Sequence, residues 1–213
     1  EGNTGGSAIR GIHLEGPFLS DARKGSHLTI YLHRPSIEEL DRLDTLSGGN
    51  VRSMTIAPEL EGAMDVIRYA CSKKITIQIG HTAADYATTI KAIDAGATVA
   101  THTFNGMEPL HHRSPGVLGA VLTDDRVTCE MIGDLVHVQG PVLQLIYRAK
   151  GPERVSLVSD SMYGAGLPEG EYTRQGRTRT VQGGVARLPD GTISGSARTI
   201  LDGVRNLVGL GIP

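Results

Sequence analysis

The chain has 213 residues, of which 39% are hydrophobic and 4% aromatic, with 28 glycines and no tryptophan. This apolar content excludes a disordered chain, and a formal charge of −2 without long runs of either sign argues against nucleic acid or a membrane surface as the main partner. Its two cysteines, Cys71 and Cys129, cannot form a disulfide framework, and no apolar stretch approaches the roughly 20 residues of a spanning helix. We therefore expect a cytoplasmic globular protein with reduced thiols.

Short apolar, β-branched segments recur along the chain without polar alternation, which is typical of strands buried on both faces. They are residues 8–14, 51–57, 75–79, 97–103, 127–132 and 155–158. Helical patterns lie between them: one opened by Ser36 with Glu39 as a capping box, then residues 60–73, 84–95 (ended by Gly96) and 141–149. Strands that alternate with helices predict βαβ units and a parallel sheet.

Polar residues cluster where these predicted strands end. They are His13 and Glu15, Glu59, His81, His102 and Asn105, His137, and Asp160. In a (β/α)8 barrel the catalytic groups come from the carboxyl ends of several strands, whereas a doubly wound open sheet concentrates its site at one switch point. The distribution therefore favours a TIM-like barrel. About six βα units are visible, so we expect the first two units to lie outside this chain.

The pattern changes after Asp160. Residues 172–192 are rich in Gly and Arg, and the Pro189-Asp190-Gly191 turn between two apolar segments predicts a β-hairpin. Ser196 is expected to open a final helix with Ile200, Val204, Leu207 and Val208 on one face. We thus expect an incomplete hydrolase barrel over residues 1–165, a hairpin or the edge of a small β domain over 166–195, and a helix returning to the barrel over 196–213.

Three segments carry metal-ligand residue types: residues 13–18, 80–82 and 101–107. Imidazoles and carboxylates bind Zn²⁺ and Fe²⁺, and three protein ligands are typical of a catalytic site. A single histidine at a strand end is more often structural, but three such strand ends in succession are a specific pattern. A fourth strand ends in Asp160, which can act as a base toward a water on the metal or, alternatively, cap a helix.

At these residues the sequence resembles the N-acetylglucosamine-6-phosphate deacetylases of the amidohydrolase superfamily. The motifs are HLEGPF, KGSH, GHT, THTFNGM, HHRSPG, DLVHV, VSDSM and ISGSART, and they occur in the family's order from about residue 10 to about residue 201. The resemblance implies a barrel beside a small β-sandwich, usually in a homodimer, with parts of both domains outside this chain.

Carried over by position, the resemblance implies that Glu15, His81 and His102 are the metal ligands and that Asp160 is the catalytic acid and base. It implies substrate contacts from Ser26 and His27 near the amide, from Asn105, Gly106 and Arg113 at the phosphate, from His137 at a sugar hydroxyl, and from Arg198, Thr199 and Ile200 along the pocket. Ala is more usual at positions 106 and 161, and an apolar residue at 198, so Arg198 is expected to reshape the acetyl pocket.

Other notable residues have weaker interpretations. His13 shares a strand face with Glu15, and we expect it to support that ligand. His112 contacts phosphate or is a plain surface histidine; both interpretations stay open. The arginines Arg174, Arg177 and Arg179 are expected to be solvated, as hairpin arginines usually are.

The resemblance predicts a hydrolase that removes acetate from N-acetylglucosamine 6-phosphate, with one or two divalent ions, Zn or Fe. Asp160 would take a proton from the attacking water and pass it to the leaving amine. Two alternatives stay open: the same chemistry on the galactosamine epimer, and an inactive barrel that only binds a sugar phosphate. The expected partner is a small amino-sugar phosphate, not nucleic acid or membrane.

Overall fold

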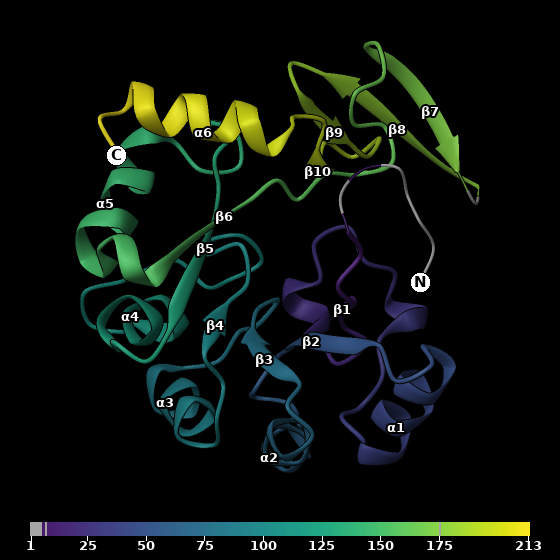
Figure 1. Ribbon diagram of the computed structural model, residues 1–213, viewed down its shortest axis with the longest axis vertical. Coiled ribbons are helices and arrows are strands. Elements are labelled where there is room, and N and C mark those ends of the chain that lie inside the picture. Colours follow the sequence, from purple (N-terminus) through teal and green to yellow (C-terminus); the bar gives the residue numbers. More distant parts are fainter. Residues whose placement is uncertain (1–5, 7, 175) are drawn as a thin grey trace.

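A computed structural model describes residues 6, 8–174 and 176–213 (Figure 1). Its main sheet has six parallel strands in chain order, β1-β2-β3-β4-β5-β6, and it is curled rather than flat. The strands are β1 (Ile12–Glu15), β2 (Val51–Ile56), β3 (Thr76–Ile79), β4 (Val99–Ala100), β5 (Thr128–Ile132) and β6 (Val155–Val158). A doubly wound sheet would reverse its strand order at a switch point, and the sequential order excludes that alternative for the described strands.

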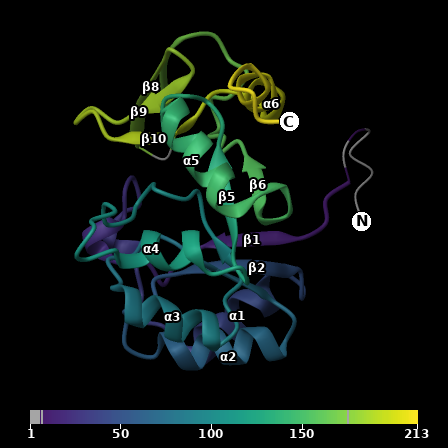
Figure 2. The ribbon, with the colours of Figure 1, turned by 90° about the vertical axis from the view of Figure 1, so that its left-hand side faces the viewer.

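Helices cover the outer side of the curled sheet in an arc, while the strands line the inner side (Figures 1 and 2). They are α1 (Ile37–Leu46), α2 (Ala63–Ser72), α3 (Tyr86–Asp94), α4 (Gly116–Thr123) and α5 (Gly140–Lys150), with short 3-10 turns at Asp21–Arg23, Thr29–Tyr31 and Pro152–Arg154. The core between the two layers consists of apolar side chains, with Met54, Ile67, Ile77 and Leu143 fully buried. None of the helices in the described part of the chain is long and apolar enough to cross a membrane.

All six predicted strands are present, with shorter bounds at several ends. The first begins at Ile12 rather than residue 8, and β4 is only two residues long because the chain turns away at Thr101. Ser36 caps α1 by accepting from the Glu39 amide, as predicted, but the Glu39 carboxylate binds Arg42 instead of closing the capping box. The periodicity does not predict α4, because every residue from Gly116 to Leu122 is buried and the helix has no polar face to mark it.

A second, antiparallel sheet follows the main one in sequence, with strand order β10-β9-β8-β7. Its strands are β7 (Gly170–Arg174), β8 (Arg177–Gln182), β9 (Val185–Arg187) and β10 (Ile193–Ser196). The predicted hairpin is β9–β10, with Ile193 opposite Arg187, and it forms part of a larger sheet. The chain then returns through α6 (Ile200–Gly209), which contacts β6.

The expected start of the last helix is wrong. Ser196 ends β10, and Thr199 is the cap of α6, in a capping box with Asp202. The expected apolar face is also only partly buried: Leu207 packs into the core, while Ile200, Val204 and Val208 are exposed.

Two glycines set how closely α6 approaches the main sheet. A Cβ added at Gly133, just after β5, would lie 2.9 Å from the Cα of Gly203 in α6 and 2.9 Å from Leu157 Cδ1. A Cβ at Gly209, at the other end of α6, would meet no atom within 4 Å. The backbone of α6 therefore lies against the turn after β5 at Gly203, whereas Gly209 faces open space.

We expect Gly133→Ala to lower the free energy of unfolding by about 1–3 kcal/mol, because the added methyl group must push α6 off the sheet. Gly209→Ala is the matched control, and we expect it to be neutral or stabilising by up to about 1 kcal/mol. Denaturant unfolding followed by circular dichroism measures both. Equal stability of the two variants would contradict the close packing.

Candidate active site

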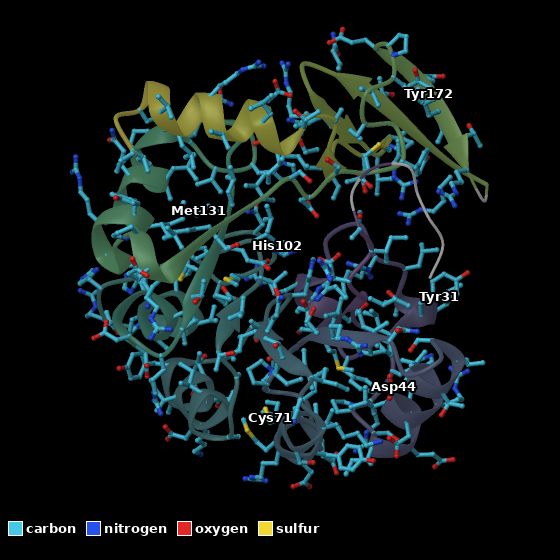
Figure 3. The ribbon with its side chains drawn as sticks, in the orientation of Figure 1. Tyr31, Asp44, Cys71, His102, Met131 and Tyr172 are labelled. Carbon is cyan, nitrogen blue, oxygen red and sulfur yellow. The ribbon has the colours of Figure 1, made fainter. Side chains whose placement is uncertain are left out.

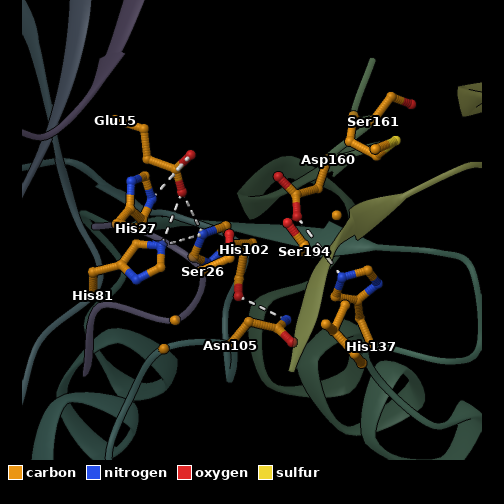
Figure 4. Close-up of a pocket in the computed structure, with 15 residues that line it drawn as sticks. Glu15, Ser26, His27, His81, His102, Asn105, His137, Asp160, Ser161 and Ser194 are labelled. Atoms are coloured by element: carbon orange, nitrogen blue, oxygen red, sulfur yellow. Dashed lines mark hydrogen bonds and ion pairs between the residues drawn. The ribbon is translucent and has the colours of Figure 1, made fainter. Parts of the chain in front are cut away.

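Three side chains of the ligand types converge at one rim of the curled sheet, where the carboxyl ends of its parallel strands meet (Figures 3 and 4). Glu15 ends β1, His81 follows β3 and His102 follows β4. The Nε2 atoms of His81 and His102 lie 2.9 and 2.8 Å from Glu15 Oε1 and 3.1 Å from each other. These three residues form the one group in the described part of the chain whose ligand atoms could all hold a single metal ion.

The backbone at these strand ends adopts an uncommon conformation. His81, His102 and Asp160 all have positive φ angles, of 47°, 28° and 48°. Non-glycine residues rarely adopt this left-handed region, because the Cβ atom crowds the backbone there, and such strain gathers at functional sites. The sharp turns direct the three side chains into the rim instead of along the strand.

The rear edges of the two imidazoles differ. His81 Nδ1 lies 2.8 Å from the Arg23 carbonyl, which can only accept, so Nδ1 carries the proton and donates. Its Nε2 atom faces Glu15. His102 Nδ1 is buried and has no partner among the described residues. Gly106 packs closely behind His81, where an added Cβ would lie 2.8 Å from Nδ1.

This arrangement fits a divalent cation. One carboxylate oxygen and two imidazole Nε2 atoms lie within 3.1 Å of one another, and this set of ligand atoms at this spacing suits a shared cation. Burial opposes ionisation of Glu15, but hydrogen bonding with His102, His27 and His81 outweighs it and holds its pKa well below its ordinary range. Glu15 is therefore charged at neutral pH, as a metal ligand must be.

Asp160 faces this group across the pocket, at the end of β6 (Figure 4). Burial raises the pKa of Asp160 above its ordinary value, with the charge of His102 opposing that shift. His137 Nε2 lies 3.8 Å from Asp160 Oδ2. Among the described residues no helix begins directly after Asp160, since the next element is β7, so its interpretation as a helix cap is wrong.

His137 is fixed from behind by Asp134. Asp134 Oδ2 lies 2.6 Å from His137 Nδ1, and its Oδ1 accepts from the amides of Val136 and His137 at 2.9 Å. Burial opposes ionisation of Asp134, yet the hydrogen bonds with His137 lower its pKa below the ordinary value. The imidazole thus presents Nε2 to the pocket in one orientation.

The pocket between these groups has a volume of about 350 Å³. Many of the residues singled out in the sequence line it: Glu15, Ser26, His27, His81, His102, Asn105, Gly106, His137 and Asp160. The His27 ring stands edge-on to His81, with centroids 4.9 Å apart, and its Nε2 lies 3.7 Å from Glu15 Oε2. The space and its polar lining suit a small polar molecule.

Four expected substrate contacts do not line this pocket. Arg113 is exposed on its loop, where its Nη1 lies 2.8 Å from His112 Nε2. Arg198, Thr199 and Ile200 lie behind the pocket wall, where the Arg198 carbonyl accepts from Ser161 Oγ at 2.9 Å. The Arg198 side chain borders a separate hollow with Asp202 and Arg205.

Several pocket residues were missed in the sequence. Ile193, Ser194 and Gly195 of β10 and Met162 also line the pocket. The first three open the ISGSART motif, of which only Arg198 and Thr199, with the following Ile200, were expected to contact the substrate; Met162 ends the VSDSM motif. His13, expected to support Glu15, instead lies 2.7 Å from Ser53 Oγ and 3.1 Å from Thr55 Oγ1.

Comparison with known proteins gives a consistent result, although no protein-family model matches the chain. It is 39% identical over 205 residues to an N-acetylgalactosamine-6-phosphate deacetylase of Escherichia coli, covering 96% of this chain and 54% of that protein. It is 37% identical to the N-acetylglucosamine-6-phosphate deacetylase of Bacillus subtilis, covering 95% of this chain and 51% of that protein.

Solved structures agree with the sequence relatives. A variant of the Mycobacterium smegmatis N-acetyl-D-glucosamine-6-phosphate deacetylase, in complex with N-acetyl-D-glucosamine-6-phosphate, superimposes with a TM-score of 0.92 at 43% identity, covering 96% of this chain and 54% of that one. The enzyme from Pasteurella multocida gives a TM-score of 0.88 at 32% identity over 96% of this chain and 54% of that one. This chain spans about half the length of the curated relatives it matches. By sequence and by fold, it matches about half of the length of N-acetylglucosamine-6-phosphate deacetylases.

Proposed function

We propose that the protein containing this chain hydrolyses the acetamide of N-acetylglucosamine 6-phosphate, releasing acetate and glucosamine 6-phosphate. The observation that carries the proposal is the Glu15, His81 and His102 group facing Asp160 across one pocket. This arrangement suits amide hydrolysis by water. Candidate metal ligands lie on one side of the pocket, and Asp160, a carboxylate with a raised pKa, lies on the other. The retained ligand group and base argue against an inactive sugar-phosphate-binding barrel.

In this proposal Glu15, His81 and His102 hold a divalent ion, Zn or Fe, in one or two sites. When bound, the ion supplies Lewis acidity toward water and the amide carbonyl. Asp160 takes the proton of the attacking water and then delivers it to the leaving amine, so one residue serves as base and acid in turn. His137, fixed by Asp134, binds a sugar hydroxyl beside Asp160. No covalent intermediate is needed.

The remaining contacts are proposed from the family resemblance. Ser26 and His27 lie on the wall nearest Glu15 and contact the amide and sugar. The backbone of Asn105 and Gly106 binds the phosphate, with Arg113 as its charged clamp; a guanidinium can grip phosphate oxygens in pairs. Arg198, Thr199 and Ile200 shape the pocket from behind its wall.

We further propose that the six parallel strands form part of an eight-stranded barrel in the whole protein. Residues 1–165 would belong to this barrel, 166–195 to a small β region over its mouth, and 196–213 to a helix that returns to it; residues 1–5 and 7 lie outside the described part. The expected assembly is a cytoplasmic homodimer that acts on a small amino-sugar phosphate, without nucleic acid or membrane.

A second candidate substrate is the galactosamine epimer, because one relative at 39% identity is an N-acetylgalactosamine-6-phosphate deacetylase. The discriminating experiment measures acetate release by the full-length protein, loaded with Zn or Fe, from both 6-phosphorylated epimers. We expect the higher kcat/KM on the gluco epimer. A higher value on the galacto epimer would reverse the assignment, and no release from either would refute the deacetylase proposal.

We expect Glu15→Gln to weaken metal binding by about 100-fold or more, because it removes the anionic ligand on which both imidazoles converge. Calorimetric titration of the metal-free protein with Zn²⁺ measures this without reference to activity. Glu153→Gln, which neutralises an exposed carboxylate outside the pocket, is the matched control and should leave affinity unchanged. Wild-type affinity in Glu15→Gln would rule out this metal site.

We expect Asp160→Asn to lower kcat by about 10²- to 10⁴-fold, because the amide keeps the shape of the carboxylate but cannot take a proton. Metal content should stay near wild type, since the three ligands remain. Turnover and metal content are therefore measured on the same sample. Near-normal turnover with full metal would place the base elsewhere, and loss of metal with activity would make Asp160 a ligand.

A further inference from the structure

Two arginines of β8 reach the walls of the pocket instead of solvent. Arg177 Nη2 donates to the Ser26 carbonyl at 2.8 Å, and Arg179 Nε donates to Ser194 Oγ at 2.7 Å. They are alternate residues of one strand, so they share a face of the sheet, and both are half-buried. The expectation that all three arginines of this segment are solvated is therefore wrong for these two; Arg174 alone is exposed.

The two contacts reach different segments that line the pocket. Ser26 belongs to the loop of residues 24–27, whereas Ser194 lies in β10 (Figure 4). A second guanidinium nitrogen of Arg179 donates to Tyr163 Oη at 3.0 Å, in the segment between β6 and β7. Arg177 by contrast leaves its own sheet and bonds to a loop 151 residues earlier in the chain. It thus ties the antiparallel sheet to the loop that carries His27.

The bonded atom constrains His27. The Ser26 carbonyl and the His27 amide belong to one planar peptide unit, so fixing that carbonyl restricts the backbone that carries the His27 ring. Within the loop, the His27 amide donates to the Lys24 carbonyl at 3.0 Å, a local turn that does not by itself anchor the loop to the rest of the molecule. The ring position matters because His27 contacts both His81 and Glu15.

We propose that Arg177 is a positioning residue, which clamps the Ser26 carbonyl and so holds His27 in place against the metal-ligand group. The antiparallel sheet then acts as a fixed cover of the pocket, joined to both of its walls. A guanidinium suits this role because it is charged at all relevant pH values and its hydrogen bonds to a neutral carbonyl are charge-assisted. The expected effect of Arg177 on turnover rests on the proposed deacetylase function. Its expected effect on the motion of the loop of residues 24–27 does not.

The loop is tested directly by amide hydrogen exchange in the full-length protein, on peptides that cover residues 25–28. We expect exchange in Arg177→Met to be about tenfold faster than in wild type, because one charge-assisted bond no longer opposes local opening. Arg174→Met is the matched control. Arg174 stands opposite Arg177 across the β7–β8 pair, and its guanidinium lies over the Tyr163 ring, 5.5 Å from the centroid. Equal exchange in the two variants would overturn the proposal.

Turnover separates positioning from simple stabilisation. We expect kcat/KM for the N-acetylated sugar phosphate to fall about tenfold in Arg177→Met, to recover partly in Arg177→Lys, and to stay at wild type in Arg174→Met. The affinity for Zn²⁺ should not change, because Arg177 contacts none of the three ligands. A lower melting temperature with wild-type kcat/KM would mean that Arg177 only stabilises the fold, and would overturn the proposal. If wild type releases no acetate, the deacetylase proposal fails, and hydrogen exchange still decides the role of Arg177.

Discussion

The Glu15 carboxylate is the interaction on which the rim depends. It ends β1 and receives the imidazoles of His81 and His102 on one oxygen, with His27 near the other. An anion at this depth is stable only among compensating groups, because burial alone would favour the neutral acid. A shared cation supplies that compensation most fully. The same requirement explains why β1, β3 and β4 end at one rim of the sheet, and why the chain turns sharply at His81 and His102.

Parallel strands in sequential order meet this requirement. Their carboxyl ends meet at one rim, so residues separated by 87 positions, such as Glu15 and His102, lie within hydrogen-bond distance. The left-handed turns at His81, His102 and Asp160 then direct the side chains inward. These turns strain the backbone. The apolar core between sheet and helices, where side chains such as Met54 and Ile77 are fully buried, supplies stability that offsets this strain.

Backbone and side-chain contacts around the rim hold the functional groups in fixed orientations. The Arg23 carbonyl orients His81, and Asp134 orients His137. Arg23 also pairs with Glu108, which joins the loop behind His81 to the loop that follows His102. The antiparallel sheet adds its own contacts from above, through Arg177 and Arg179. The candidate metal ligands, Asp160 with its neighbour His137, and the antiparallel sheet are thus held by short contacts between segments that are far apart in sequence.

The sequence alone determined the elements and the chemistry at their ends. Unalternating β-branched segments predicted all six strands, and residue type and position identified Glu15, His81, His102 and Asp160. It did not predict α4, because a helix buried on all sides shows no periodicity. Nor could it place Arg113 or Arg198 relative to the pocket, because Arg113 lies in a loop before α4 and Arg198 follows a strand of the antiparallel sheet, not of the parallel one.

Only the tertiary structure decided which side chains share a wall. Arg177 and the Ser26 carbonyl are 151 residues apart, and no local pattern records that contact. Arginines in a hairpin look the same in sequence whether they face water or a neighbouring loop. The sequence fixes the conformation of each segment through local hydrogen bonds and apolar spacing, whereas contacts between segments follow from how the packed layers meet. The residues of the candidate site were therefore recognisable in the sequence, whereas the contacts that hold them in place were visible only in the fold.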